Sequence, residues 1–221
     1  MEEHLGIEGQ RYYGPRLERH KIIFDHLSVL PTDRVLDVGC ALGEFLENFQ
    51  GECALLVGVD LDHNYLTECR RFVPYAQLVQ ANAAHLPFAD GSFDILTATN
   101  LLEHLDNPTV FLKEARRVCA RAAVFVTPNL GRPSRMLAAM RGETRYEVSG
   151  HKQGWDYHLL NQVLENTGWK VDRIEPRFVD FPLYHLFPQR FSRWMSYTVL
   201  KRLFPMIGSE LFSFCSIQGD A

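Results

Sequence analysis

The stretch VLDVGCALGEFLENF, Val35–Phe49, begins with a mostly apolar run, continues through a turn of small residues and ends in a helical pattern. The apolar run predicts a strand buried on both faces, as in a parallel sheet. Asp37 interrupts this run two residues before Gly39, and a buried charge requires a partner. We therefore expect a strand, a turn and a helix, with either the backbone or a ligand as the partner of Asp37.

Apolar strands alternate with helices on both sides of this stretch, which predicts a parallel sheet covered by helices on both faces. Asp156 is expected to cap the last helix and Gly168 to close it. The helices are expected at 16–29, 43–50, 63–72, 108–120 and 156–168. The strands are expected at 34–38, 55–60, 76–80, 93–98, 122–127, 169–178 and 210–217.

Composition narrows the class of protein. The 221 residues include 23 Lys and Arg against 27 Asp and Glu, and the formal charge of -4 argues against a nucleic-acid partner. The five cysteines form no CxxC pair, so neither a metal site nor a disulfide framework is predicted. The polar start MEEHLGIEGQ predicts no signal peptide, and no apolar run reaches the roughly 18 residues of a membrane span. A cytoplasmic protein is expected.

The turn after the first strand has the spacing D-x-G-x-x-x-G, formed by Asp37, Gly39 and Gly43. Ligands of open parallel sheets bind beyond the carboxyl ends of the strands, where this turn lies. A carboxylate there can order the loop amides and attract an ammonium group, whereas it would repel the pyrophosphate of a dinucleotide. We therefore expect a ligand with a positive charge; the alternative is that Asp37 only caps the loop.

Two further positions extend the ligand site. Asp60 ends the second strand, where an acidic side chain accepts hydrogen bonds from two ribose hydroxyls. The alternative role for Asp60 is to cap the helix at 63–72, but Asp62 can do this. After the third strand, the Asn82 amide can read an adenine edge and the Ala83 amide can pair with a ring nitrogen.

Together with LPF at 86–88, FD at 93–94 and EH at 103–104, these pieces resemble the class I S-adenosylmethionine-dependent methyltransferases over roughly residues 20–175. The expected fold is α/β, doubly wound and Rossmann-like, with a mostly parallel seven-stranded sheet whose last strand is antiparallel. The resemblance implies a binding site for S-adenosylmethionine that holds its methionine part, its ribose, its adenine and the side of its sulfonium. The implied cofactor-binding residues are Asp37, Gly39, Cys40, Ala41, Gly43, Asp60, Leu61, Asn82, Ala83, Asn100 and Leu101.

Three positions depart from the family pattern. Ala41 replaces the usual middle glycine, Asn82 replaces the usual aspartate, and CARAA at 119–123 replaces the common proline–glycine–glycine turn. Asn82 can still accept a hydrogen bond through its carbonyl oxygen, and alanine is small. These departures leave open a protein that binds S-adenosylmethionine without catalysis and acts by interaction.

Two histidines are the candidate catalytic residues. His104 follows the fourth strand at the expected rim of the methyl site, and His151 lies in the segment where this family builds its acceptor pocket. Either could act as a general base, although methyl transfer can proceed by alignment and desolvation alone. The alternative for each is a structural hydrogen bond. Glu103 could orient His104 or cap the following turn.

The segment 181–209 contains no Asp or Glu and combines aromatic residues with four basic ones. It predicts either an apolar cover over the acceptor pocket or an amphipathic helix that contacts anionic lipid at the membrane surface. With the loop region 129–154, this insertion at 179–209 would form the acceptor side of a single methyltransferase domain, 1–221.

The sequence therefore predicts methyl transfer from S-adenosylmethionine to a small-molecule or lipid-linked acceptor, with S-adenosylhomocysteine as the product. One alternative is a nicotinamide-dependent oxidoreductase, which Asp37 and the lack of a second nucleotide-binding half disfavour. The other is the non-catalytic binding protein.

Overall fold

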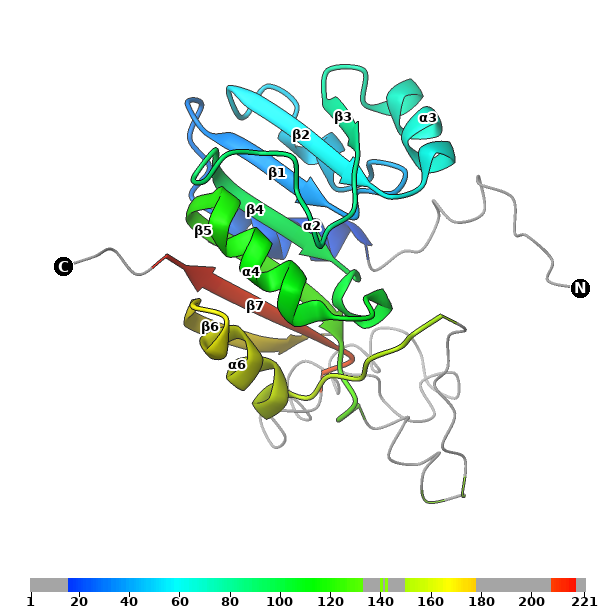
Figure 1. The fold of residues 1–221 in the computed structure, drawn as a ribbon, viewed down its shortest axis with the longest axis vertical. Coiled ribbons are helices and arrows are strands. Elements are labelled where there is room, and N and C mark those ends of the chain that lie inside the picture. The colour runs from blue at the N-terminus through cyan, green and yellow to red at the C-terminus, as the bar shows by residue number, and fades with distance from the viewer. Residues whose placement is uncertain (1–15, 133–139, 141, 143–149, 178–207, 218–221) are drawn as a thin grey trace, which may run out of the picture. The chain divides into compact units, whose positions relative to one another are not determined.

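The computed structural model describes residues 16–132, 140, 142, 150–177 and 208–217. Its strands are hydrogen-bonded in the order β3-β2-β1-β4-β5-β7-β6 (Figure 1). Strand β1 is parallel to β2 and β4, β2 is parallel to β3, and β7 is antiparallel to β6. The strands are β1 Arg34–Val38, β2 Leu55–Asp60, β3 Gln77–Gln80, β4 Phe93–Thr99, β5 Cys119–Pro128, β6 Lys170–Arg177 and β7 Glu210–Ser216. The predicted seven-stranded α/β fold with an antiparallel last strand is confirmed.

Two helices begin at the capping residues that the sequence predicts. The side chain of Asp62 accepts from the Asn64 amide at 2.8 Å, and that of Asp156 accepts from the Leu159 amide at 2.9 Å. Gly168 takes a φ of +89° just beyond the last helix. The α-helices are α2 Arg16–His26, α3 His63–Phe72, α4 Pro108–Val118 and α6 Tyr157–Asn166, and the 3-10 helices are η1 Leu46–Phe49 and η2 Leu102–His104.

The helix predicted at 43–50 is present only as the shorter 3-10 helix η1, Leu46–Phe49. Gly43 has a φ of +79° and Ala41 a φ of +45°, both in the left-handed region that a right-handed helix excludes. The chain therefore turns after β1 and forms only the short η1. Phe49 of η1 packs against Phe24 of α2, with ring centroids 5.0 Å apart, which fixes this segment without an α-helix.

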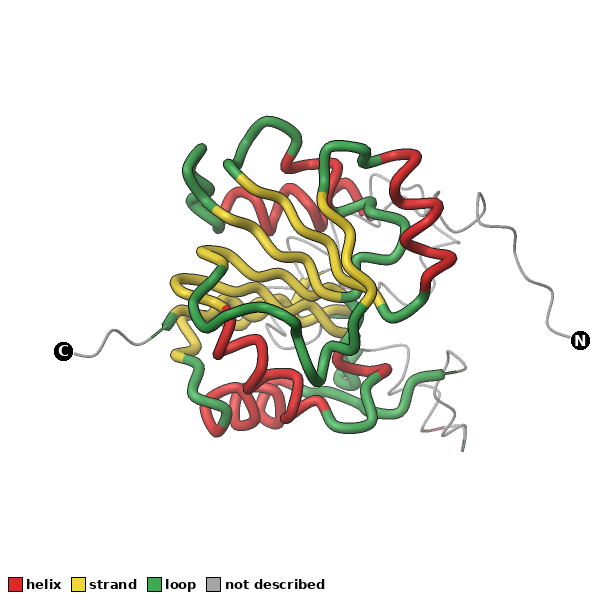
Figure 2. Tube along the Cα trace, turned by 45° about the horizontal axis from the view of Figure 1, so that its top comes forward, coloured by secondary structure: helices red, strands yellow, loops and turns green. Residues whose placement is uncertain are grey.

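The chain divides into two compact units, of which the first comprises the residues up to Thr97 together with Arg117–Ala122. In this unit Val35, Leu36 and Val38 of β1 are completely buried. Helix α3 packs against β2 and β3, and Figure 2 shows these strands with β1 as neighbouring yellow tubes. The carboxyl ends of β1, β2 and β3 therefore lie at one edge of the first unit.

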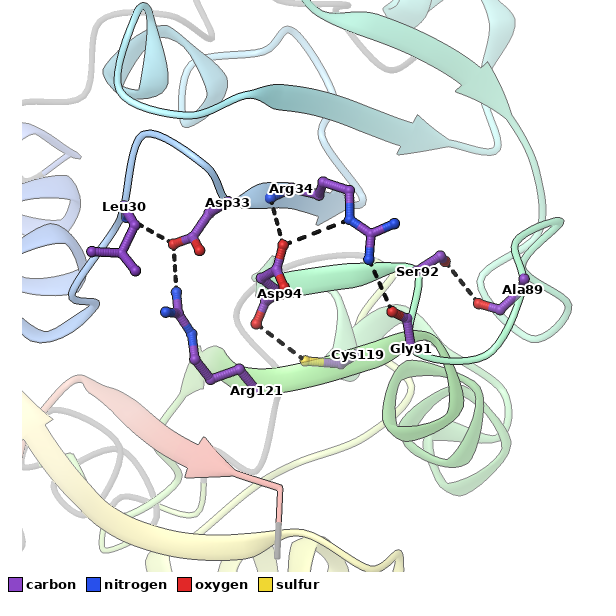
Figure 3. A network of polar contacts seen from close by, with 9 residues as sticks. All are labelled: Leu30, Asp33, Arg34, Ala89, Gly91, Ser92, Asp94, Cys119 and Arg121. Atoms are coloured by element: carbon purple, nitrogen blue, oxygen red, sulfur yellow. Dashed lines mark hydrogen bonds and ion pairs between the residues drawn. The ribbon is translucent and has the colours of Figure 1, made fainter. Parts of the chain in front are cut away.

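The opposite ends of the strands in this unit are joined by a polar network (Figure 3). Asp33 is buried, accepts from the Leu30 amide at 2.8 Å and pairs with Arg121 of β5. The Arg34 amide donates to Asp94 Oδ2 at 2.8 Å. These bonds tie the starts of β1, β4 and β5 together. They lie at the end of β1 opposite to the predicted ligand site, so their role is structural.

The second unit comprises Ala98–Arg116 and the residues from Ala123 onward. Its core is aromatic: Phe125 of β5 contacts Phe111 of α4 at 6.2 Å and Trp169 at 5.2 Å between ring centroids, both edge to face. The Trp169 indole donates to the Leu112 carbonyl at 3.1 Å, so its one polar atom is satisfied inside the core. Helix α6 packs against β6.

Across the described residues, no helix is long and apolar enough to cross a membrane. The insertion predicted at 181–209 lies outside the described residues except for Gly208 and Ser209. The loop region 129–154 is described at 129–132, 140, 142 and 150–154. There, Asn129 Nδ2 donates to the Gly208 carbonyl at 2.8 Å, which ties the end of β5 to the residues before β7.

Candidate functional site

The turn after β1 is held by its neighbour strand. The amides of Gly39 and Cys40 both donate to the Val59 carbonyl, at 2.7 Å and 3.0 Å, and the Gly43 amide donates to the Cys40 carbonyl at 2.8 Å. Gly39 has a φ of +76°, which glycine adopts without the steric cost of a Cβ atom. The backbone of the turn is therefore held by hydrogen bonds within the chain.

Asp60 is the carboxylate that orders this turn. Its Oδ2 accepts from the Ala41 amide at 2.9 Å, and its Oδ1 accepts from the Asp62 amide at 2.9 Å. A carboxylate has about four acceptor sites, so each oxygen retains capacity for one more donor. Asp60 is half-buried at the end of β2. It can therefore serve the turn and accept two ribose hydroxyls at once.

Asp37 bonds to a side chain instead of to the loop amides expected from the sequence. It is 2% exposed, and its Oδ1 accepts from Thr97 Oγ1 of β4 at 2.8 Å. Burial raises the pKa of this carboxyl from 3.8 to about 7; the bond from Thr97 lowers the pKa and the negative charge of Asp60 raises it. A cation at this edge would favour the ionised form of Asp37.

Ala41 and Gly43 meet different constraints. Ala41 has a φ of +45°, a conformation in which a side chain costs about 1–2 kcal/mol, and this explains why glycine is usual at the position. A Cβ atom on Gly43 would lie 2.4 Å from Cys69 Sγ and 2.6 Å from Val73 Cγ2. Gly43 is therefore required by its packing against the end of α3, and not by the start of a helix.

The side chain of Cys40 points into the core. Its thiol is hydrogen-bonded to that of Cys69, and both residues are buried. This bond and burial raise the pKa of Cys40, whereas the same bond lowers the pKa of Cys69. Cys40 therefore offers only its backbone to the turn.

The candidate adenine residues lie beside Asp60. Gln80 pairs with Asp60 in the β2–β3 ladder, and the Ala81 amide donates to the Asp60 carbonyl at 3.1 Å. Asn82 is the next residue, so its backbone begins beside Asp60. Asn82 is exposed, and its Oδ1 accepts from the Ala84 amide at 2.9 Å. Ala83 is buried, and Leu61 is 66% exposed. The first unit thus gathers Asp60, Leu61, Asn82 and Ala83 at one edge.

Asn100 lies in the second unit, directly after β4. Its φ is +52°, and its amide donates to the Val126 carbonyl at 2.8 Å. Its side-chain Oδ1 is buried and has no hydrogen-bond partner among the described residues. A buried acceptor in that state calls for a donor from a ligand. Leu101, the next residue, is half-buried.

His104 and His151 are brought together in the second unit. Their ring centroids lie 4.8 Å apart, with the rings nearly perpendicular. His104 Nδ1 lies 3.3 Å from the Gly150 carbonyl. Because a carbonyl only accepts, this hydrogen bond requires the proton on Nδ1 and leaves a lone pair on Nε2. The candidate base therefore has one defined basic nitrogen.

Glu103 holds the two histidine segments together. Its carbonyl accepts from the Lys152 and Gln153 amides at 2.7 Å and 3.1 Å. Its carboxylate is buried, and Oε2 accepts from Thr127 Oγ1 at 3.1 Å. The backbone of Glu103 thus positions the segment of His151, a role that neither sequence interpretation of this residue anticipated.

Comparison with known proteins finds methyltransferases. A family model described as a methyltransferase domain matches residues 36–127. The chain is similar to a probable S-adenosylmethionine-dependent methyltransferase of Mycobacterium tuberculosis, with 30% identity over 114 residues that cover 50% of this chain and 42% of the relative. It is also similar to a ubiquinone biosynthesis O-methyltransferase of Dechloromonas aromatica, with 29% identity over 76% of this chain and 75% of the relative.

Among solved structures, a SAM-dependent methyltransferase from Archaeoglobus fulgidus has the same fold, with a TM-score of 0.65 and 20% identity over 91% of this chain and 94% of that chain. Residues 36–127 therefore match the methyltransferase-domain family, and the fold is that of the class I S-adenosylmethionine-dependent methyltransferases. The chain spans less than half the length of its M. tuberculosis relative.

The donor set of the methyltransferase fits the cofactor of its family, S-adenosylmethionine. Two carboxylates, Asp37 and Asp60, make the edge of the first unit negative, which suits a ligand with an ammonium and a sulfonium charge. Asp60 retains acceptor capacity for hydroxyls. In the second unit, the buried Oδ1 of Asn100 lacks a donor from the described residues.

Sequence analysis missed three residues of this site: Thr97, Thr127 and Gly150. Thr97 bonds Asp37, Thr127 bonds Glu103, and the Gly150 carbonyl orients His104. A threonine inside an otherwise apolar strand is the available signal, since a buried hydroxyl requires an acceptor. Nothing in the sequence points to Gly150, because it acts through its backbone.

Proposed function

We propose that the chain transfers a methyl group from S-adenosylmethionine to a hydroxyl of a small-molecule or lipid-linked acceptor. The observation that carries the proposal is the pair His104 and His151, with the His104 ring oriented by the Gly150 carbonyl. A hydroxyl is a weak nucleophile until it loses its proton, and a basic imidazole nitrogen can accept that proton. The Dechloromonas relative is named a ubiquinone biosynthesis O-methyltransferase, and this name supports a hydroxyl as the acceptor group.

The roles of the cofactor residues belong to the same proposal. Asp60 accepts the ribose hydroxyls, Asn82 and Ala83 bind the adenine, and Asp37 with the turn from Gly39 to Gly43 binds the methionine part. Asn100 and Leu101 bind on the sulfonium side. The bonds that already hold the turn and Asp60 support this assignment, because a preformed site loses little entropy when the ligand binds.

Methyl transfer is an in-line displacement on a sulfonium. The acceptor oxygen forms a bond to the methyl carbon while the carbon–sulfur bond breaks, and the sulfur leaves as neutral S-adenosylhomocysteine. The hydroxyl proton goes to His104 Nε2 or to the ring of His151. Alignment and exclusion of water can supply most of the rate. The base lets the oxygen attack at neutral pH.

The experiment measures S-adenosylhomocysteine formation from S-adenosylmethionine with a set of hydroxylated aromatic acceptors, soluble and prenylated. With an accepted substrate, His104→Ala or His151→Ala should lower turnover about 100-fold while cofactor affinity stays nearly unchanged. His158→Ala, at an exposed histidine of α6, is the matched control. Turnover near wild type in both histidine variants would contradict the base assignment.

A second measurement separates the remaining alternatives. Binding of S-adenosylhomocysteine without product formation for any acceptor would favour the non-catalytic binding protein. Preference for NAD in a direct titration would favour the oxidoreductase.

Contact of residues 181–209 with anionic lipid is proposed for the case of a lipid-linked acceptor. Sedimentation of the protein with anionic but not with neutral vesicles at low salt would support this contact, and equal recovery with both kinds of vesicle would contradict it.

A further inference from the structure

Glu103, His104 and His151 form a cluster whose donor atoms all lie within 4.8 Å of one another. Zinc binds imidazole nitrogen and carboxylate oxygen at about 2.0–2.2 Å, so the ligand atoms around one ion lie about 3–4 Å apart. His104 is exposed and His151 half-buried, so neither ring is held in a closed core and each can rotate towards that spacing. The three side chains therefore have both the chemistry and the proximity of a metal site.

The groups behind these donors match those of metal ligands. A metal-binding histidine usually donates its other ring N–H to a carbonyl or carboxylate, and ligating carboxylates are hydrogen-bonded in turn. His104 Nδ1 is placed to donate to the Gly150 carbonyl, which leaves Nε2 for the ion. Glu103 Oε2 accepts from Thr127 Oγ1. Two of the three donors are thus oriented before an ion arrives.

The backbone also holds the cluster in place. The Lys152 and Gln153 amides donate to the Glu103 carbonyl, so the segment that carries His151 is fixed against η2. The Lys152 ammonium, next to His151 in the chain, is paired with Asp106 at 2.6 Å. A preorganised donor set of this kind binds an ion with less loss of conformational entropy than a set on separate flexible segments.

We propose that Glu103, His104 and His151 bind one divalent first-row transition ion, with zinc as the best match. Two imidazoles and one carboxylate satisfy three positions of a zinc ion and leave at least one for water or for an oxygen of a ligand. Metal binding by this cluster needs neither the cofactor nor the acceptor, although it uses the two histidines proposed as bases. In the metal-free chain the imidazole nitrogens are bases, whereas with the ion bound they are its ligands.

The sequence predicts no metal site, because its five cysteines form no CxxC pair. Glu103 and His104 are neighbours in η2, but His151 lies beyond the whole of α4 and β5. Two adjacent ligands and one distant histidine form no recognisable spacing. The site exists only because the Glu103 carbonyl ties the two segments together.

Cobalt(II) serves as the probe, because its visible absorption reports nitrogen and oxygen coordination. The chelator-treated full chain is titrated with Co²⁺, and Zn²⁺ is then added. We expect a saturable band at one equivalent that Zn²⁺ abolishes, together with a rise in the unfolding temperature on addition of Zn²⁺. No saturable band in a chain that circular dichroism shows to be folded would overturn the proposal.

Variants assign the ligands. His104→Ala and His151→Ala should each abolish the band or weaken Co²⁺ binding by about 100-fold or more, and Glu103→Gln should weaken it while preserving size. Thr127→Val should weaken binding by about 10-fold, because it removes only the support of the carboxylate. His158→Ala should bind like wild type. Wild-type binding by both ligand variants, or equal loss in the His158 control, would overturn the assignment.

The outcome is distinguishable from that of the proposed function, because Co²⁺ binding needs neither cofactor nor acceptor. Methyl transfer by the chelator-treated chain without Co²⁺ binding would overturn the metal site alone. Co²⁺ binding by a chain that transfers no methyl group after treatment with the chelator would overturn the proposed function alone.

Discussion

Replacement of Asp37 by asparagine should stabilise the fold at alkaline pH and weaken cofactor binding at the same time. The side chain is 2% exposed, and its observed partner is the Thr97 hydroxyl. Asparagine retains the size of aspartate and an oxygen that can accept from Thr97, but it carries no charge. The substitution therefore removes the cost of a buried charge and, with it, the attraction for an ammonium group.

The magnitude follows from the pKa of Asp37, which burial raises from 3.8 to about 7. Below pH 3.8 the carboxyl is protonated in the folded and the unfolded chain, and asparagine brings no gain. Between 3.8 and about 7 only the folded chain binds the proton, so wild-type stability falls as pH rises. Above about pH 7 the full cost is present, up to about 4 kcal/mol at about 1.4 kcal/mol for each pKa unit.

The assay is urea unfolding of wild type and Asp37→Asn at about pH 5, 6, 7 and 8. The difference in the free energy of unfolding should increase with pH and level off above about pH 7. Thr97→Val is the control, because loss of the hydrogen bond that lowers the pKa of Asp37 should extend the pH-dependent decline to higher pH. A variant that is no more stable than wild type at pH 8 would refute the argument from burial.

Calorimetry with S-adenosylhomocysteine tests the other half of the prediction. Asp37→Asn should bind more weakly at pH 8, where wild-type Asp37 is ionised. Wild-type affinity itself should decline as pH falls below about 7, because the ligand must then displace a proton. Undiminished binding by the stable variant would show that Asp37 contacts no cationic group of the ligand.

Three further substitutions test the turn and its carboxylate, and a fourth, Gly51→Ala, is the control for Gly43→Ala. Asp60→Ala should weaken S-adenosylhomocysteine binding by about 1–3 kcal/mol in calorimetry, and unchanged affinity would contradict the ribose assignment. Gly43→Ala should lower the free energy of unfolding by about 2–4 kcal/mol, because its Cβ would lie 2.4 Å from Cys69 Sγ. Gly51→Ala, with a similar φ of +78° and no atom within 4 Å, should cost only about 1 kcal/mol; equal losses would refute the packing argument. Ala41→Gly should raise the free energy of unfolding by up to about 1 kcal/mol, and a loss would mean that the φ of +45° carries no strain.

Local sequence determined most of the elements. The apolar runs predict β1 and β2 to the residue, and the caps Asp62 and Asp156 start their helices as expected. These features depend on the side-chain period and on hydrogen bonds between residues two or three apart, so the sequence contains the whole interaction. The spacing of Asp37, Gly39 and Gly43 likewise predicts a turn at the end of β1, because glycine adopts the positive φ that Gly39 and Gly43 show.

The tertiary structure decided how these elements are used. In the turn after β1, Gly43 packs against the end of α3, and the Ala41 amide is ordered by Asp60 from the neighbouring strand. His104 meets His151 because amides 49 and 50 residues away donate to the Glu103 carbonyl. Each of these bonds joins segments that are distant in the chain. Their partners are set by strand register and loop path, which no local pattern encodes.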